Sequence, residues 1–204
     1  MKKPNNFAIA IQKLAIKAVI IVFAPPVAAI VTSTVPFSTV KYRNIVYSAN
    51  VHHMPTVFKT PQELLDASGA DLGVTDWLEI TQERINLFAE ATGDHQWIHT
   101  NPEKAKDGPF GTTIAHGYLT LSLTNLFLPD LLQVTEISMG INYGVNKIRF
   151  PQPVPVNSRI RAHGSITEVE EIKGGVQAVV QLTIEIDGVE KPACIVESIS
   201  RFLN

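Results

Sequence analysis

The stretch IAHGYLTLSLTNLFLPDLL, residues 114–132, decides the fold, because it has the length of a helix and almost no polar face. Its large apolar side chains are Leu119, Leu121, Leu123, Leu126, Phe127 and Leu128. A helix that is apolar on all sides is normally buried. Pro129 is expected to weaken its last turns. The stretch therefore predicts a helix that is buried nearly all round and needs a sheet wrapped around it.

The C-terminal third of the chain supplies such a sheet. Four segments read as strands, at 141–150, 158–172, 176–188 and 191–203. In the third segment the apolar residues alternate with mostly polar ones, which is the period of a half-buried antiparallel strand; they are Val176, Ala178, Val180, Leu182, Ile184 and Ile186. Gly174-Gly175 and Asp187-Gly188 are hairpin signals. The order of elements predicts an α+β fold, with an antiparallel sheet curled around one long central helix.

A short helix is predicted before the central one, within WLEITQERINLFAEATG. Thr81 is a good N-cap residue, and Ile80 with Ile85 can form a hydrophobic staple across the helix start. Gly93 is placed to end the helix. Farther upstream, PQELLDA (61–67) can begin with a short helix, and NPEKAKDGPFGTT (101–113) reads as a polar connection.

The loop after that helix, GDHQWIH (93–99), holds one carboxylate and two imidazoles within seven residues. Asp94 and His99 would diverge on a continued helix, but a turning loop can bring both toward one point. Such a pair can hold a water molecule, with the aspartate orienting it and the histidine exchanging its proton. Free N–H groups at the start of the central helix, around Gly117, can stabilise negative charge on a carbonyl oxygen. This arrangement suits the addition of water to an activated double bond, or its removal.

Composition narrows the function classes. The 17 Lys+Arg against 19 Asp+Glu give a formal net charge of -2, which argues against nucleic acid binding. The one cysteine, Cys194, excludes an internal disulfide framework and reads as a buried strand thiol. A reducing, cytoplasmic location is therefore expected.

Residues 1–53 are set apart by their charge, because the first acidic residue of the chain is Glu63. Their apolar run at 18–31 is shorter than the roughly 20 residues of a membrane span and contains Pro25-Pro26. Three interpretations stay open, namely a presequence, a membrane anchor or a start site assigned too far upstream. Membrane contact is expected only if the extension is a real anchor. Residues 54–204 have the length of a single domain.

Two longer strings carry a family resemblance. ATGDHQWIHTNPEKAKDGPFGTTIAHGYLTLSL (91–123) and YGVNKIRFPQPVPVNSRIR (143–161) resemble the MaoC-like dehydratases, and most closely their NodN-type branch of stand-alone hydratases. The resemblance covers nearly all of 54–204. It implies a hotdog fold and a homodimer that interconverts trans-2-enoyl-CoA and (R)-3-hydroxyacyl-CoA without cofactor or metal. The acyl group would arrive on coenzyme A or on acyl carrier protein.

The same resemblance assigns residues. The family's catalytic aspartate falls on Asp94, its histidine on His99 and its oxyanion-binding amide on Gly117. In many members the loop reads D-x-N-P-[LIV]-H, whereas Gln96 and Trp97 replace the Asn-Pro here. The bulk of Trp97 bears on the loop shape and on the acyl-chain length.

Other interpretations stay open for several residues. His95 and His99 are four apart, like metal ligands on a helix, but Gly93 disfavours a helix there. His116 is expected to pack at the helix start, and a chemical role is the alternative. Four basic residues could meet coenzyme A phosphates or simply face solvent; they are Lys147, Arg149, Arg159 and Arg161. Trp77 and Trp97 are expected to be packing or interface residues.

Two other functions compete with hydration. A hotdog thioesterase would release the free thiol of coenzyme A. A non-catalytic acyl-thioester binding protein would bind the thioester in the same pocket without turning it over. The presence of both Asp94 and His99 argues against this function, because binding alone does not require the pair.

Overall fold

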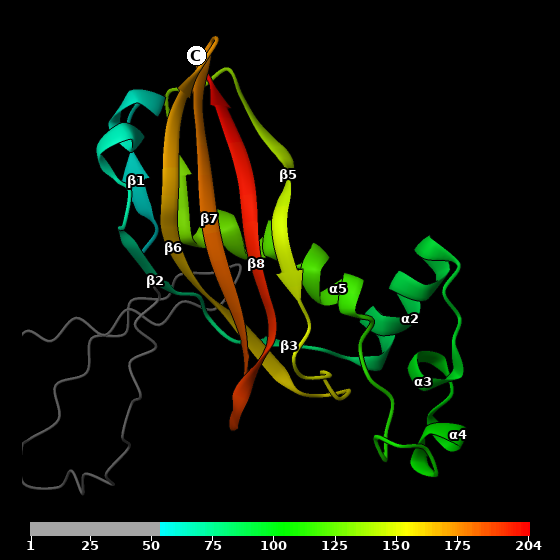
Figure 1. The fold of residues 1–204 in the computed structure, drawn as a ribbon. Coiled ribbons are helices and arrows are strands. Elements are labelled where there is room, and N and C mark those ends of the chain that lie inside the picture. Colours follow the sequence, from blue (N-terminus) through cyan, green and yellow to red (C-terminus); the bar gives the residue numbers. More distant parts are fainter. Residues whose placement is uncertain (1–53) are drawn as a thin grey trace, which may run out of the picture. The chain divides into compact units, whose positions relative to one another are not determined.

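The computed structural model describes residues 54–204 (Figure 1). The extension before residue 54, with its three interpretations, lies outside the described residues. The elements in chain order are β1 (Thr56–Phe58), the 3-10 helix η1 (Pro61–Asp66), β2 (Asp71–Val74), β3 (Leu78–Glu79), α2 (Gln82–Thr92), α3 (Trp97–Thr100), α4 (Pro102–Lys106), α5 (Gly117–Ser122), α6 (Thr124–Leu131), β4 (Leu132–Val134), β5 (Met139–Arg149), β6 (Arg159–Ile172), β7 (Gly175–Ile186) and β8 (Val189–Leu203).

The main sheet confirms the predicted antiparallel meander. Its strand order is β2-β6-β7-β8-β5, with β3 paired to β6. The alternating apolar residues of β7 are all buried, from Val176 to Ile186. The two predicted hairpin turns are formed with positive φ angles at Gly174 and Gly188, which glycine adopts without steric cost. Cys194 is buried in β8, and burial raises the pKa of its thiol to about 11.

The central helix lies against the sheet, where α5 contacts β8 and α6 contacts β6 (Figure 1). The prediction that it is buried nearly all round is wrong for the single chain. Tyr118 is 70% exposed and Leu126 is 48% exposed, on the side of the helix that faces away from the sheet. One sheet covers only one side of a helix, so the apolar pattern overstated the burial. The helix is also divided at Leu123, and Pro129 lies inside its second part.

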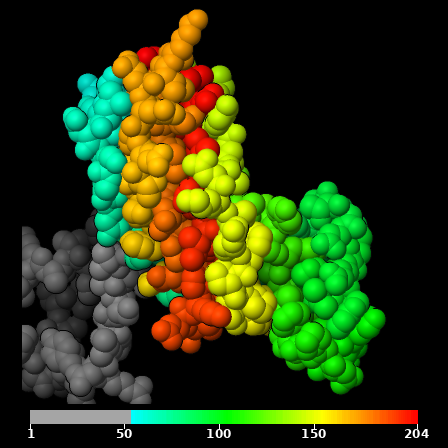
Figure 2. Space-filling view, in the orientation of Figure 1, coloured from blue at the N-terminus to red at the C-terminus, as the bar shows by residue number. Residues whose placement is uncertain are grey.

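Helix α2 forms with the predicted ends. The Thr81 side chain accepts a hydrogen bond from the Arg84 N–H, and Gly93 adopts the left-handed conformation at the C-cap with φ 78°. Ile80 and Ile85 are both buried in the core, as the predicted staple requires. The residues of α2, α3 and α4 gather as a lobe beside the strands (Figure 2).

Two short helices replace segments that were predicted to be irregular. His99 lies on the single turn α3, not on a loop, and α4 forms inside the polar connection. Hydrogen bonds between side chains and the backbone stabilise both helices. The Thr100 hydroxyl donates to the carbonyls of His95 and Gln96, and the Asn101 side chain accepts from the Lys104 N–H as the N-cap of α4.

No helix among residues 54–204 is both long enough and apolar enough to cross a membrane.

Candidate active site

A cavity of about 300 Å³ lies at the amino end of α5. It brings together residues from α3, the start of the central helix, the segment after β5 and β8. The lining residues are His99, Phe110, Ile114, Ala115, Gly117, Thr120, Phe150, Gln152, Pro153, Val154 and Ala193. Two of the three residues predicted for the site, His99 and Gly117, therefore share one cavity.

His99 is buried, and its ring has a defined hydrogen-bond partner. Its Nδ1 lies 2.7 Å from the carbonyl oxygen of Ile114. Since a carbonyl only accepts, Nδ1 carries the hydrogen and Nε2 is left with a lone pair. Burial is the main cause that lowers the pKa of His99 below 6.5; nearby His116 also lowers it, while the hydrogen bond to Ile114 and the charge of Asp94 raise it. The ring is thus a neutral base at pH 7.

Asp94 follows the helix-ending Gly93 directly, and its side chain is 54% exposed. One carboxylate oxygen accepts a hydrogen bond from the Gln96 N–H at 3.3 Å. A carboxylate oxygen of Asp94 and ring nitrogens of His99 and His116 all lie within 4.8 Å of one another. Two hydrogen bonds of about 2.8 Å each can span that separation, so one water molecule can bridge the carboxylate and an imidazole.

Gly117 is the first residue of α5, so its N–H has no acceptor within the helix. A Cβ placed on Gly117 would lie 3.1 Å from the Phe150 ring, closer than normal packing allows. The glycine therefore lets an aromatic wall approach the helix start. The exposed ring of Tyr118 lies 6.2 Å from the Phe150 ring, outside the cavity lining.

Packing was the preferred prediction for His116, with a chemical role as the alternative, and the residue makes two specific contacts. Its ring stacks on the His99 ring with centroids 3.8 Å apart. Its Nε2 donates to the backbone carbonyl of Asp94 at 2.9 Å. The histidine is thus placed between both members of the predicted pair.

The cluster of Asp94, His99 and His116 has the residue types of a metal site but not its geometry. The two rings are stacked with an angle of 25° between their planes. Imidazole lone pairs lie in the ring plane, so stacked rings do not direct them to one ion about 2.1 Å from each nitrogen. His95, the other candidate ligand, is exposed and lies 3.7 Å from Glu90 at the surface.

Three of the four basic residues proposed for phosphate contacts are paired with carboxylates. Lys147 pairs with Glu197 at 3.2 Å, Arg161 with Glu185 at 2.7 Å, and Arg159 with Asp187. Both of these arginines also lie over the Trp77 ring. The Arg149 guanidinium donates to the carbonyl of Ile148, next to the cavity wall.

Trp97 does not line the cavity. Its ring contacts Gly108, where an added Cβ would lie 2.9 Å from the indole, and the Lys104 ammonium lies 4.7 Å from its centroid. The bulk of Trp97 therefore shapes the α3–α4 segment, as expected for a packing residue.

The Gln82 side chain holds α3 in place through hydrogen bonds that the sequence did not predict. The Gln82 amide donates to the His99 carbonyl at 2.8 Å, and its oxygen accepts from the Thr113 hydroxyl at 2.5 Å. These partners are 17 and 31 residues apart along the chain, so no local spacing signals them.

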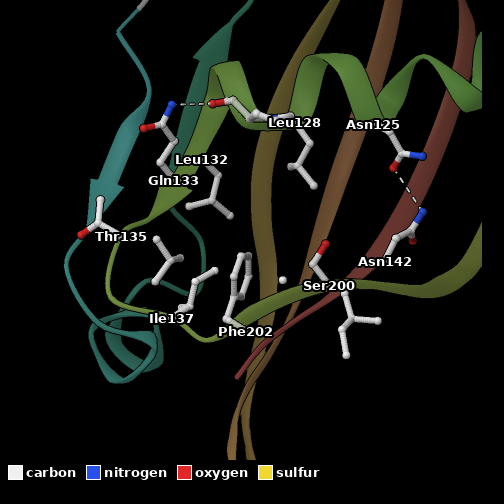
Figure 3. Close-up of a pocket in the computed structure, with 13 residues that line it drawn as sticks. Asn125, Leu128, Leu132, Gln133, Thr135, Ile137, Asn142, Ser200 and Phe202 are labelled. Atoms are coloured by element: carbon white, nitrogen blue, oxygen red, sulfur yellow. Dashed lines mark hydrogen bonds between the residues drawn. The ribbon is translucent and has the colours of Figure 1, made fainter. Parts of the chain in front are cut away.

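A second cavity, of about 450 Å³, lies near the carboxyl end of α6 (Figure 3). Leu128, Leu132, Ile137 and Phe202 give it a mainly apolar wall. At one end, the Asn142 amide donates to the Asn125 oxygen at 3.1 Å. This cavity lies on the same helix pair and on the same strand, β8, as the first one.

The fold and the cavity can now be compared with known proteins. The MaoC like domain matches residues 64–188, which is more than half of the chain. The chain belongs to the MaoC-like dehydratase family. Its sheet of antiparallel strands against one helix pair is the hotdog fold. The (R)-hydratase from A. caviae involved in PHA biosynthesis has this fold, with a TM-score of 0.54 at 22% identity over 65% of this chain and 94% of that one.

Curated relatives are more similar in sequence. The 3-hydroxyacyl-thioester dehydratase Z of Mycobacterium tuberculosis (strain CDC 1551 / Oshkosh) is 52% identical over 72% of this chain and 97% of that protein. Nodulation protein N of Rhizobium leguminosarum bv. viciae is 41% identical over 61% of this chain and 80% of that protein. With this family membership, the chain is an enzyme of the hydro-lyase class.

Proposed function

We propose that the protein catalyses the reversible hydration of a trans-2-enoyl thioester to the (R)-3-hydroxyacyl thioester. The observation that carries the proposal is the presence of a neutral imidazole and a helix-start N–H at one cavity, with a carboxylate oxygen within 4.8 Å of that imidazole. The names of the relatives support the reaction class. The acyl carrier is coenzyme A or acyl carrier protein.

The proposed step uses three groups of this chain. The Asp94 carboxylate orients a water molecule, and His99 Nε2 takes one of its protons as the oxygen adds to C3. Negative charge moves to the thioester oxygen, where the Gly117 N–H donates a hydrogen bond worth roughly 3 kcal/mol in the transition state. C2 then receives the proton that His99 took from the water, so the imidazole is neutral again and the double bond has been replaced by C–O and C–H bonds. Dehydration follows the same path backward, so neither a cofactor nor a metal is needed.

The second cavity gives room for the acyl tail. Leu128 of its apolar wall lies on the order of 16 Å along the helix from Gly117, at 1.5 Å rise per residue, and we propose that a long acyl tail extends that far. An apolar tail gains free energy when it leaves water for such a wall. The size of this cavity is therefore proposed to set the preferred chain length.

The test is turnover of crotonyl-CoA by the full chain, followed by loss of the enoyl thioester absorbance. Asp94→Ala and His99→Ala are each expected to lower the rate by about 10²- to 10⁴-fold, with unchanged circular dichroism. Wild-type rates in both variants would contradict the assignment. A matched control is His95→Ala, because this neighbouring histidine is exposed and lies outside the cluster.

The two competing functions give different readouts in the same assay. A thioesterase releases coenzyme A thiol, which a thiol reagent detects, whereas hydration releases none. A binding protein retains acyl-CoA without turnover of any chain length.

We further propose that the protein is a homodimer. Within the described residues, β5 is an edge of the sheet that pairs only with β8 over its 11 residues. Tyr143 and Val145 are exposed on it, and a long apolar edge favours pairing with another chain. Light scattering is expected to give twice the chain mass, and Val145→Lys is expected to weaken the association. A monomer at micromolar concentration would contradict this.

A further inference from the structure

His116 holds a position that the proposed reaction does not use. The residue is 3% exposed, and its ring lies between Phe88 of α2, with centroids 5.1 Å apart, and His99 of α3. Nε2 carries the hydrogen that is donated to the Asp94 carbonyl, so Nδ1 carries the lone pair. Nδ1 is buried and has no hydrogen-bond partner among the described residues. Natural proteins rarely leave a buried polar atom unpaired without a reason.

The hydrogen bond from His116 reaches a segment whose local hydrogen bonds are long. The Asp94 segment follows a helix end, and the local bonds of Asp94 are long, at 3.4 Å from its N–H to Thr92 and 3.3 Å from Gln96 to its carboxylate. The 2.9 Å bond from His116 ties the same residue to the start of the central helix, 22 residues away. The stacked ring meanwhile limits the movement of the His99 ring.

We propose that His116 is a positioning residue. It holds the Asp94 loop through its Nε2–H and the His99 ring by stacking, and so keeps the Asp94 carboxylate and the His99 imidazole in a fixed relative position. The inference rests on the proposed function of Asp94 and His99. A shift of about 1 Å in a reacting group can lower a rate by about 10²-fold, so a single tether between the two groups has a measurable effect.

Two titratable groups act on the pKa of His99: His116 lowers it and Asp94 raises it. The other contacts of the two rings are neutral. Helix α2 presents Phe88 to His116, and the Gln82 amide meets the His99 backbone. The cavity wall after β5 presents Phe150 and Gln152. Loss of the His116 imidazole is therefore expected to move the titration of His99 to higher pH.

Two variants separate the two contacts. In His116→Gln the amide nitrogen can replace Nε2 as the donor to Asp94, while the stacked ring is lost. In His116→Phe the ring is kept and the donor is lost. We expect kcat for crotonyl-CoA to fall at least tenfold in His116→Phe and less than threefold in His116→Gln. His163→Gln is the control, because His163 on β6 is exposed, pairs with Asp71 on β2 and does not line the cavity.

A second measurement does not depend on activity. The titration of His99 is followed by NMR of its ring Cε1–H in the substrate-free protein, and its midpoint is expected to rise in both variants. Equal kcat in His116→Phe and wild type, with an unmoved His99 titration, would overturn the inference. A lower melting temperature with neither change would mean a structural role and would also overturn it. If the wild type does not hydrate any enoyl thioester, the proposed function fails, while the NMR titration still tests the contact.

Discussion

The two ends of the α5–α6 helix pair carry cavities of opposite chemistry. The cavity at the amino end of α5 holds a buried imidazole, a free N–H and a nearby carboxylate. The one near the end of α6 is larger, at about 450 Å³ against about 300 Å³, and mainly apolar. The cavity at the amino end of α5 has the groups for the proposed hydration, whereas the cavity near the end of α6 offers only apolar space for an acyl tail. Substitutions at the first should therefore affect all substrates, and those at the second should discriminate by length.

Among substitutions that keep both Asp94 and His99, the largest effect is expected from Gly117→Ala. The added Cβ would lie 3.1 Å from the Phe150 ring, so the ring or the helix start has to move by a few tenths of an ångström. We expect kcat/KM to fall by about 10- to 100-fold for short and long enoyl-CoAs alike, because the N–H is displaced from the thioester oxygen. Adding Phe150→Leu, which removes the clash, should restore part of the rate. A loss confined to long substrates would contradict the proposal that the cavity at the amino end of α5 acts on all substrates alike.

A smaller and selective effect is expected from Leu128→Phe. Leu128 lines the apolar cavity, and a larger ring there takes space from the end of the acyl chain. We expect kcat/KM to fall about tenfold for long enoyl-CoAs and less than twofold for crotonyl-CoA, since a steric change in an apolar pocket is worth about 1–3 kcal/mol.

The control for that variant is Leu126→Phe, two residues away on the exposed side of the helix. It adds the same ring outside the cavity and should change neither substrate. Equal losses for both chain lengths in Leu128→Phe would show that the second cavity does not hold the acyl tail.

The sequence was sufficient for most of the sheet and for one helix. Strand β7 follows a period of two between two glycine turns, and α2 has Thr81 and Gly93 at its ends, so these signals are local. The exposed side of the central helix was not predicted, because the apolar pattern does not tell how many sides a sheet covers. The parallel pair of β1 with β4 joins three-residue strands about 76 positions apart, which leaves no local signal.

The site, like the fold, was predictable where its signals are local and not where it depends on long-range packing. Asp94, His99 and Gly117 were found from residue types beside a helix end and a helix start, and the structure brings them to one region. Their catalytic roles stay predictions. The stack of His116 on His99 and the bonds from Gln82 depend on how α2 packs on α3, which no single segment encodes.

The pH dependence tests the protonation state at the polar end. Burial lowers the pKa of His99 below 6.5, and the base must be neutral to take a proton from water. As the pH falls, the hydration activity should therefore decline with a midpoint below pH 6.5. The measurement is kcat/KM for crotonyl-CoA between pH 5 and 8. A midpoint above 6.5 would show that the imidazole is more solvated than its burial implies.

The smallest effects are expected at the basic residues outside both cavities, where charge pairing distinguishes two neighbours. Lys147 pairs with Glu197 at 3.2 Å. Among residues 54–204, the guanidinium of Arg149 donates to the backbone carbonyl of Ile148 and forms no ion pair, and Arg149 precedes Phe150 of the cavity wall. An exposed ion pair is worth about 0–1 kcal/mol, so Arg149→Gln should raise KM for crotonyl-CoA by at most about fivefold if its charge meets a phosphate. Lys147→Gln should leave KM within twofold, because its charge is already neutralised. Equal KM values in the two variants at low salt would remove phosphate binding from this surface and leave the cavity contacts to account for substrate affinity.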